Sequence, residues 1–170
     1  MKILLTWLFI FSTTSVYALD KQLLKEARQA INVLKSADPN LKSVFSSAHA
    51  YAVLPNVGQG GFIVSVIHGN GIVFKGGSPI GSTEMKQGSV GFSIGGKSFI
   101  EVIFFQNSQS LKNFTEGNAK FTAGSSLYNL VKGKPQKVKY KEGMAVVTMV
   151  KGGLMLDTSI GGQDFDYKAK

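Results

Sequence analysis

All 20 glycines of this 170-residue chain lie at Gly58 or beyond, which divides the chain into two parts of different composition. In the first part, apolar residues recur with the period of a helix. In the second part, short β-rich runs alternate with glycine pairs, and glycine allows the sharp turns and bulges that separate strands. Helices followed by many short strands predict an α+β fold with an antiparallel sheet. We expect two N-terminal helices packed on a glycine-rich sheet or on a barrel-like sandwich.

An amphipathic helix is predicted over residues 20–36, with Asp20 as its N-cap. Its apolar residues share one arc of the helix and are Leu23, Leu24, Ala27, Ala30, Ile31 and Leu34. A narrower basic stripe runs beside this arc and consists of Lys21, Lys25, Arg28 and Lys35. A second helix is predicted to begin at Asp38 and Pro39, with Asp38 as its N-cap and Pro39 at its first helical position.

Several short strands are predicted after the second helix. They cover residues 51–54, 62–67, 72–74, 88–94, 98–105, 119–127, 137–140, 144–150 and 154–160. Asn70-Gly71 predicts a hairpin between two of these runs. Residues 76–87 are a candidate loop, and residues 108–114 are a candidate helical turn. Because no repeat or linker divides the chain after residue 18, residues 19–170 are predicted to form a single domain.

The first eighteen residues have the pattern of a secretory signal peptide. Lys2 provides a positive charge, and residues 3–11 form a short apolar run. Val16 and Ala18 are small residues at the positions that a signal peptidase inspects. The apolar run has about half the length that spans a bilayer. We therefore expect removal of residues 1–18, a periplasmic or secreted location, and peripheral rather than spanning contact with a membrane.

The chain is strongly basic, with 19 Lys and Arg residues against 10 Asp and Glu residues and a formal net charge of +9. Arg28 is its only arginine. Lysine acts as a hydrated point charge, whereas arginine is the usual residue for bidentate recognition of phosphates and bases. The charge therefore favours diffuse attraction to an anionic surface and argues against a nucleic-acid partner. The absence of cysteine excludes disulfides and thiolate metal sites.

One motif suggests a hydrolase but lacks what that chemistry needs. Gly91-Phe92-Ser93-Ile94-Gly95 matches the nucleophile elbow, which requires an acid and then a histidine later in the chain. Both histidines, His49 and His68, precede Ser93. The flanking residues alternate like a strand rather than a strand-to-helix turn. We therefore predict that Ser93 is not catalytic and that the protein is not an enzyme.

Two further motifs also lack residues that their chemistry requires. Residues 76–83 nearly match a phosphate-binding loop but have Ser82 where that loop needs a lysine. Residues 164–166 offer two carboxylates, which are too few for an EF-hand, and are better explained by a solvated terminal strand. We predict no cofactor and no metal site.

The basic helix over residues 20–36 remains as a first candidate for function. An apolar face beside a basic stripe is typical of a helix on a membrane surface. The basic residues that would attract the surface are Lys21, Lys25 and Arg28. The apolar residues that would insert are Leu23, Leu24 and Ile31. A helix that packs on the sheet with a solvated basic face has the same pattern, so this alternative stays open.

A lysine-rich segment over residues 130–141 is the second candidate. Its candidate lipid-binding residues are Lys132, Lys134, Lys137, Lys139 and Lys141. If residues 137–141 are extended, the last three of these lysines share one face, and Val138 and Tyr140 share the other. Each lysine near an anionic bilayer contributes about 1 kcal/mol. An edge strand that lysines protect from pairing with other chains has the same pattern, and both interpretations stay open.

Three stretches carry a resemblance to a known family. Residues 48–62 (AHAYAVLPNVGQGGF) lead from small residues into a proline and a glycine-rich segment, residues 69–73 (GNGIV) continue it, and residues 88–97 (GSVGFSIGGK) open a central strand region. This glycine and proline spacing resembles the SYLF lipid-binding domain family of bacterial exported proteins and eukaryotic membrane-trafficking and actin-patch proteins. The resemblance covers nearly all of residues 20–170 and implies lipid binding without established catalytic residues.

Together these features predict a non-enzymatic module that binds lipid or an anionic membrane surface of the cell envelope. The expected partners are anionic phospholipid or lipopolysaccharide. The alternative is an envelope structural or protein-interaction domain that does not bind lipid and whose lysines only confer solubility. The oligomeric state stays open.

Overall fold

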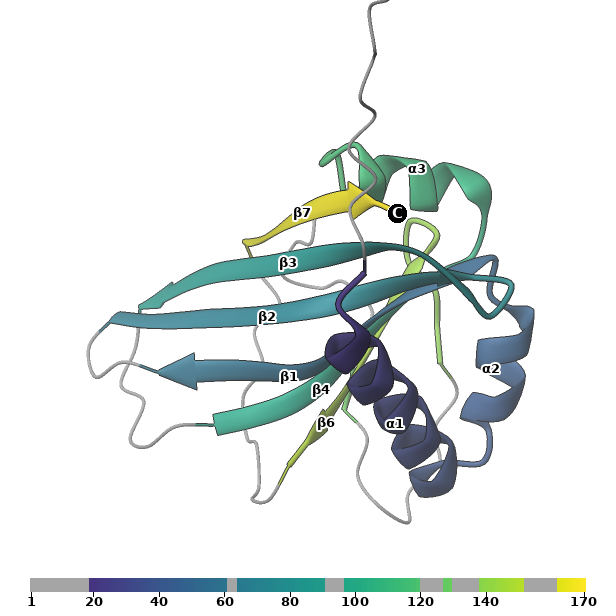
Figure 1. The fold of residues 1–170 in the computed structure, drawn as a ribbon, viewed down its shortest axis with the longest axis horizontal. Coiled ribbons are helices and arrows are strands. Elements are labelled where there is room, and N and C mark those ends of the chain that lie inside the picture. The colour runs from purple at the N-terminus through teal and green to yellow at the C-terminus, as the bar shows by residue number, and fades with distance from the viewer. Residues whose placement is uncertain (1–18, 61–63, 91–96, 120–126, 130–137, 152–161) are drawn as a thin grey trace, which may run out of the picture.

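The computed structural model describes residues 19–60, 64–90, 97–119, 127–129, 138–151 and 162–170 (Figure 1). Within these residues the helices are α1 (Lys21–Ala37), α2 (Leu41–Ser47) and α3 (Ser108–Thr115). The strands are β1 (Ala50–Gly60), β2 (Val64–Lys75), β3 (Ser78–Val90), β4 (Lys97–Phe105), β5 (Leu127–Asn129), β6 (Met144–Val150) and β7 (Gln163–Ala169). The predicted α+β class is confirmed; α1 and α2 precede the strands, and α3 lies between β4 and β5.

The strands form one sheet with the order β5-β6-β4-β1-β2-β3-β7. β5 pairs with β6 in parallel, and the other neighbouring pairs are antiparallel. In the described part of the chain, β5 and β7 are the two ends of this order. The sheet is therefore not closed into a barrel among the described strands.

Both faces of the sheet carry a hydrophobic core. Successive side chains of β4 point to opposite faces, as strand geometry requires. Val102 and Phe104 belong to the core cluster that contains residues of α1 and α2. Ile103 and Phe105 belong to a second cluster that contains Phe114 of α3. α1 and α2 therefore cover one face, and α3 covers the other.

α1 forms where the sequence predicts a helix. The Asp20 carboxylate accepts hydrogen bonds from the backbone N–H groups of Gln22 at 2.8 Å and Leu23 at 3.2 Å, so Asp20 is the N-cap. The buried residues of α1 are Ala27, Ala30, Ile31 and Leu34, all from the predicted apolar arc. The helical period of the sequence thus identified the face that packs on the sheet.

α2 begins later than predicted. The backbone N–H of Asp38 donates to the Leu34 carbonyl at 2.9 Å, so Asp38 ends α1. The Asp38 carboxylate accepts from the N–H of Asn40 at 2.9 Å. The N–H of Leu41 then bonds the Asp38 carbonyl at 3.0 Å, which makes a tight turn before the helix. Asp38 still satisfies a backbone donor here, but regular helix starts at Leu41.

The hairpin predicted at Asn70-Gly71 is wrong. β2 runs through these two residues and pairs with β1 on one side and β3 on the other. Glycine is needed here because β2 lies very close to β1: a Cβ on Gly71 would lie 2.7 Å from the Val53 carbonyl oxygen.

β1 is longer than predicted. The predicted strand ended before Pro55, but β1 continues beyond it through a register shift between Val53 and Asn56.

The turn between β2 and β3 lies at Gly76 and Gly77 instead. Their φ values of +56° and +78° fit a two-residue hairpin, in which both central residues need positive φ. The candidate loop over residues 76–87 is therefore wrong beyond this turn, since β3 begins at Ser78 and pairs along its length with β2.

Other predictions have mixed outcomes. Residues 98–105, 108–114 and 144–150 form β4, α3 and β6 as expected, and the terminal strand expected around residues 164–166 is β7. Residues 138–140 are not a strand, and Lys141 forms an isolated bridge with Met144. Several predicted features lie wholly or largely outside the described residues: the signal peptide 1–18, the motif at 91–95, and the strands at 119–127 and 154–160.

Candidate functional site

The basic stripe of α1 lies on the surface of the molecule. Lys21, Lys25 and Arg28 are all exposed, and their spacing of four and three residues places them along one side of the helix. Within the described residues none of the three forms a salt bridge. The nearest acids along the helix are engaged elsewhere, because Asp20 caps the backbone and Glu26 accepts from the Gln22 and Asn56 side chains. No ion pair among the described residues therefore neutralises the charge of these three side chains.

The three residues predicted to insert into a membrane differ in how deeply they are buried. Leu23 and Leu24 are half-buried and pack against the core cluster under α1. Ile31 is only 8% exposed and belongs to that core. The prediction that Ile31 inserts into a membrane therefore does not fit this conformation, because helix packing on the sheet already uses its side chain.

An exposed apolar residue of α1 escaped the sequence analysis. Val33 is 45% exposed and lies outside the predicted apolar arc. It borders a depression of about 440 Å³ on the α1 side of the sheet, whose other lining residues are Asn32, Ser36, Ala37 and Met149. The sequence did indicate this exposure, because Val33 is a valine on the polar side of an amphipathic helix.

Cations of α1 lie close to the aromatic core beneath the helix. The Lys35 ammonium sits over the Phe45 ring, 4.9 Å from its centroid. Tyr51 stacks on Phe74 at 5.3 Å. Burial raises the pKa of the Tyr51 hydroxyl, and the nearby Arg28 charge partly opposes that rise.

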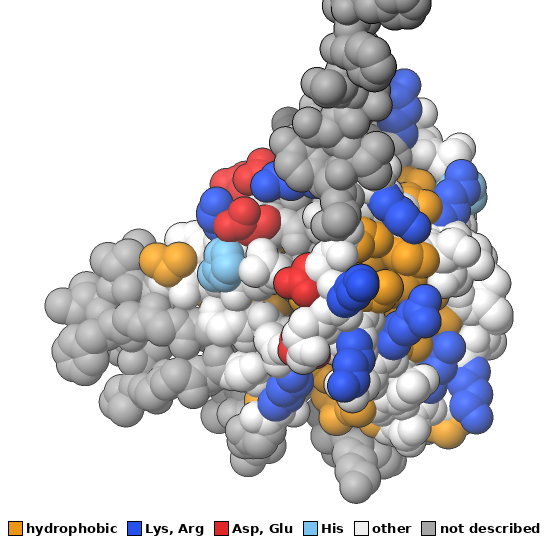
Figure 2. Space-filling view, in the orientation of Figure 1, with side chains coloured by type: hydrophobic (Ala, Val, Ile, Leu, Met, Phe, Trp, Pro, Cys, Tyr) orange, Lys and Arg blue, Asp and Glu red, His pale blue; other side chains and the backbone are white. Residues whose placement is uncertain are grey.

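The surface over these helices is basic. Figure 2 shows Lys and Arg side chains gathered over α1 and α2 around exposed hydrophobic side chains.

The described end of the lysine-rich segment lies on the same face as α1. Val138 and Tyr140 are half-buried and pack against the core cluster that α1 and α2 form with the sheet, while Lys139 and Lys141 are exposed. Burial raises the pKa of the Tyr140 hydroxyl. The predicted alternation of apolar and basic side chains is present over these four residues. Lys132, Lys134 and Lys137 lie outside the described residues.

A buried carboxyl on β4 also escaped the sequence analysis. Glu101 is 1% exposed, and its Oε2 accepts a hydrogen bond from Nε2 of Gln163 on β7 at 3.3 Å. Burial raises the pKa of the Glu101 carboxyl to about 7, although the Gln163 hydrogen bond acts in the opposite direction. The sequence did contain an indication of this burial: Glu101 is the one acid in an apolar strand, and its neighbours have the side chains of core residues.

The described residues hold few groups of catalytic or metal-binding type. They contain no cluster of three or more His, Cys, Asp or Glu side chains that could hold a metal ion. Nε2 of His68 pairs with the Glu84 carboxylate at 3.0 Å on the surface, and His49 is half-buried. Residues 76–83 form a hairpin turn and the start of β3, not the strand–loop–helix of a phosphate-binding loop.

None of the described helices is both long enough and apolar enough to span a bilayer. Neither a scan against models of protein families nor a search among curated proteins finds a match to this chain. The resemblance to the SYLF family therefore stays a prediction.

Proposed function

We infer that this protein is a non-enzymatic module that binds anionic membrane surfaces peripherally, with the face that carries α1. The observation that carries the proposal is the stripe of Lys21, Lys25 and Arg28, which is exposed and unpaired among the described residues. Leu23 and Leu24 flank this stripe and are only half-buried, so apolar surface lies next to the positive charge.

The strength of the attraction follows from the charge of the stripe. Each basic residue near an anionic bilayer contributes about 1 kcal/mol, so three contribute about 3 kcal/mol, or roughly a hundredfold in affinity. Asp20 and Glu26 accept hydrogen bonds from neutral groups and keep their negative charge, so they oppose part of this attraction. The exposed Lys139 and Lys141 belong to a segment that packs on the same face, which extends the basic surface.

The expected lipids follow from the predicted export. A protein exported to a bacterial envelope meets phosphatidylglycerol, cardiolipin and lipopolysaccharide, all of which carry negative charge. Diffuse attraction by lysines suits such surfaces better than recognition of one headgroup. Binding is expected to weaken as salt is added, since exposed charges are screened over about 10 Å at 0.1 M ionic strength.

Co-sedimentation with liposomes tests the proposal. The purified protein is expected to pellet with phosphatidylglycerol vesicles at low salt and to stay in solution with phosphatidylcholine vesicles. Arg28→Glu is expected to weaken binding at least about fivefold, because it removes one favourable charge and adds a repulsive one.

A matched control uses the other face of the sheet. Lys112 lies on α3 and is exposed, and Lys112→Glu makes the same change of charge. This control is expected to reduce binding by clearly less than Arg28→Glu does. Equal and negligible binding to both kinds of vesicle at low salt would contradict the proposal. If Arg28→Glu loses a protein partner while its binding to lipid is unchanged, the alternative of an envelope protein-interaction domain is favoured.

A further inference from the structure

A groove lies between α1 and the part of the sheet that β4 and β6 form. It consists of the depression of about 440 Å³ beside Val33 and of a second hollow of about 200 Å³, which Val33 also lines. Met149 of β6 lines the first hollow, and Ile100 of β4 lines the second. Because Met149 and Ile100 are register partners, the two hollows are neighbours and form one groove.

The walls of this groove are mainly apolar. On the helix, Val33 and Ala37 are four residues apart and therefore lie on one flank of α1. Ile100 and Met149 belong to the opposite wall. From Glu26 at one end to Ala37 at the other, the rise of the helix gives the groove a length of about 16 Å. The groove thus has the shape and the lining that suit an extended alkyl chain.

One end of the groove is polar and carries a cation. Lys151 follows β6 and lines this end together with Asn56 and Glu26. Nζ of Lys151 donates to Oδ1 of Asn56, and Nδ2 of Asn56 donates to Oε2 of Glu26 at 2.8 Å. An ammonium has three N–H donors, and Asn56 takes one of them. Lys151 forms no salt bridge with a described residue, so its ammonium can pair with an anion in the groove.

Glu26 keeps its negative charge at the same end but is not paired with Lys151. The two side chains form no salt bridge, and the Asn56 amide bonds both of them. An anion that bonds a remaining N–H of Lys151 therefore lies nearer to the ammonium than to the Glu26 carboxylate. Since the energy between two charges falls with their distance, attraction by Lys151 outweighs repulsion by Glu26.

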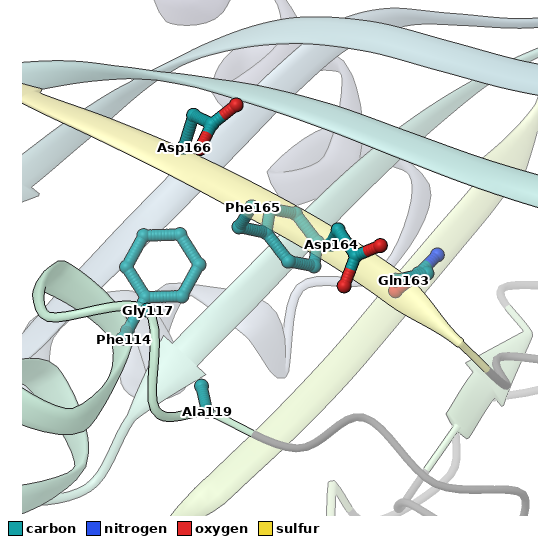
Figure 3. A pocket seen from close by; sticks show the side chains of 7 residues that line it. All are labelled: Phe114, Gly117, Ala119, Gln163, Asp164, Phe165 and Asp166. Carbon is teal, nitrogen blue, oxygen red and sulfur yellow. The ribbon is translucent and has the colours of Figure 1, made fainter.

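The pocket of about 280 Å³ between α3 and β7 is less suitable for such a ligand (Figure 3). Phe114 and Phe165 line it and pack against each other, with ring centroids 5.2 Å apart, so no chain fits between the two rings. Asp164 and Asp166 also line it and are exposed, which disfavours an anion there.

We propose that the groove beside α1 binds a free fatty acid, with its alkyl chain along Val33, Ile100 and Met149 and its carboxylate on Lys151. A length of about 16 Å accommodates an extended chain of about twelve carbons. This function goes beyond the proposed binding to membrane surfaces, which depends on the exposed stripe of Lys21, Lys25 and Arg28.

Titration calorimetry of the full chain with dodecanoate, below its micelle concentration, tests the site. Saturable one-to-one binding is expected. Octanoate has the same carboxylate and four fewer methylenes, and it is expected to bind at least about tenfold more weakly, because each buried methylene changes affinity about fourfold. Absence of saturable binding, or equal affinity for octanoate, would overturn the proposal. No vesicle is present, so the result does not depend on whether the protein binds membranes.

Two exposed valines provide a matched pair that locates the chain. Val33 is 45% exposed and Val66 on β2 is 58% exposed, so neither substitution disturbs the core. Val33→Asp puts a charge against the alkyl chain and is expected to weaken dodecanoate binding about tenfold or more. Val66→Asp makes the same change outside the groove and should leave binding within about threefold. Similar losses in both variants would overturn the assignment to this groove.

Two variants of opposite sign locate the carboxylate. Lys151→Gln removes the pairing cation and is expected to weaken dodecanoate binding about fivefold. Glu26→Gln keeps the shape of the side chain and removes a repulsive charge, so binding is expected to tighten about twofold. If both variants change the affinity in the same direction, the carboxylate does not lie at Lys151.

A last arm distinguishes a free fatty acid from a phospholipid chain. Lysophosphatidylglycerol with a dodecanoyl chain has the same alkyl group and a larger anionic headgroup. It is expected to bind more weakly than dodecanoate, because the hollow at the polar end has only about 200 Å³. Equal or tighter binding of the lysophospholipid would overturn the assignment to a free acid.

Discussion

At the scale of single residues, the glycines of β2 are important because they lack a side chain. β1 shifts its register between Val53 and Asn56, next to this part of β2. A Cβ on Gly71 would lie 2.7 Å from the Val53 carbonyl oxygen and 2.8 Å from Cγ of Leu54. The backbone of β1 cannot move aside without disturbing its pairing with β4. Only glycine therefore lets the two strands approach as they do.

Gly71→Ala is expected to lower the free energy of unfolding by about 2 kcal/mol, because overpacking of a filled interior costs about 1–3 kcal/mol. Gly58→Ala is the control, since a Cβ on Gly58 meets no atom within 4 Å. It is expected to change stability by no more than about 0.5 kcal/mol. Urea unfolding of both variants measures the difference, and similar losses would contradict this account of Gly71.

At the scale of secondary-structure elements, α1 is the part of the molecule that the sequence predicts best. Its cap and its packing face depend on residues within the helix itself. The face that it presents outward carries the candidate membrane-binding residues Lys21, Lys25 and Arg28. The predicted basic stripe could therefore be identified from sequence alone. The burial of Ile31 beneath it could not, because that depends on how closely the helix approaches the sheet.

Asp20→Ala is expected to destabilise the protein by about 1 kcal/mol, because it leaves the N–H groups of Gln22 and Leu23 without their capping carboxylate. Asn40→Ala provides the comparison. Asn40 holds the N-cap position of α2 but makes no capping hydrogen bond through its side chain. Its loss is expected to stay within about 0.5 kcal/mol. Thermal unfolding followed by circular dichroism measures both, and a larger loss for Asn40→Ala would contradict the prediction.

At the scale of the whole molecule, the sheet curls so that distant strands meet. β4 and β7 are separated by β1, β2 and β3 in the strand order, yet Gln163 of β7 contacts Glu101 of β4 at 3.3 Å. Phe114 of α3 joins the same two strands, with ring centroids 4.9 Å from Phe105 and 5.2 Å from Phe165. This curl buries the Glu101 carboxyl and forms the pocket beside α3.

The buried carboxyl makes stability depend on pH. Burial raises the pKa of Glu101 from its ordinary 4.5 to about 7, so the native state keeps a proton that the unfolded chain releases above pH 4.5. The contribution of protonated Glu101 to stability is fully present below pH 4.5 and is lost as the pH rises through about 7. Relative to the wild type, Glu101→Gln is therefore expected to gain about 2 kcal/mol in unfolding free energy between pH 5 and pH 8.

Chemical unfolding at the two pH values measures this difference, with Glu84→Gln as the control. Hydrogen bonds from Lys86 and His68 lower the pKa of the exposed Glu84 carboxyl. Glu84 is therefore ionised in both the native and the unfolded state at pH 5 and above. The difference between Glu84→Gln and the wild type should stay constant over this range. A constant difference for Glu101→Gln as well would contradict the burial of its charge.

The sequence by itself determined the features that depend on near neighbours along the chain. These include the extent and cap of α1, the alternation of side chains in β4, and the basic stripe that carries the proposed function. Helical and strand periods are local, so a single segment is enough to express them. The α+β class followed from the order of these segments.

Only the tertiary structure decided what depends on residues far apart in sequence. Asn70-Gly71 is a turn signal on its own, but pairing with β1 and β3 on both sides makes it the interior of a strand. Glu101 is an ordinary acid in sequence, and the curl of the sheet buries it against Gln163. Packing between distant strands fixes burial, and burial decides whether a polar side chain faces solvent or forms a site.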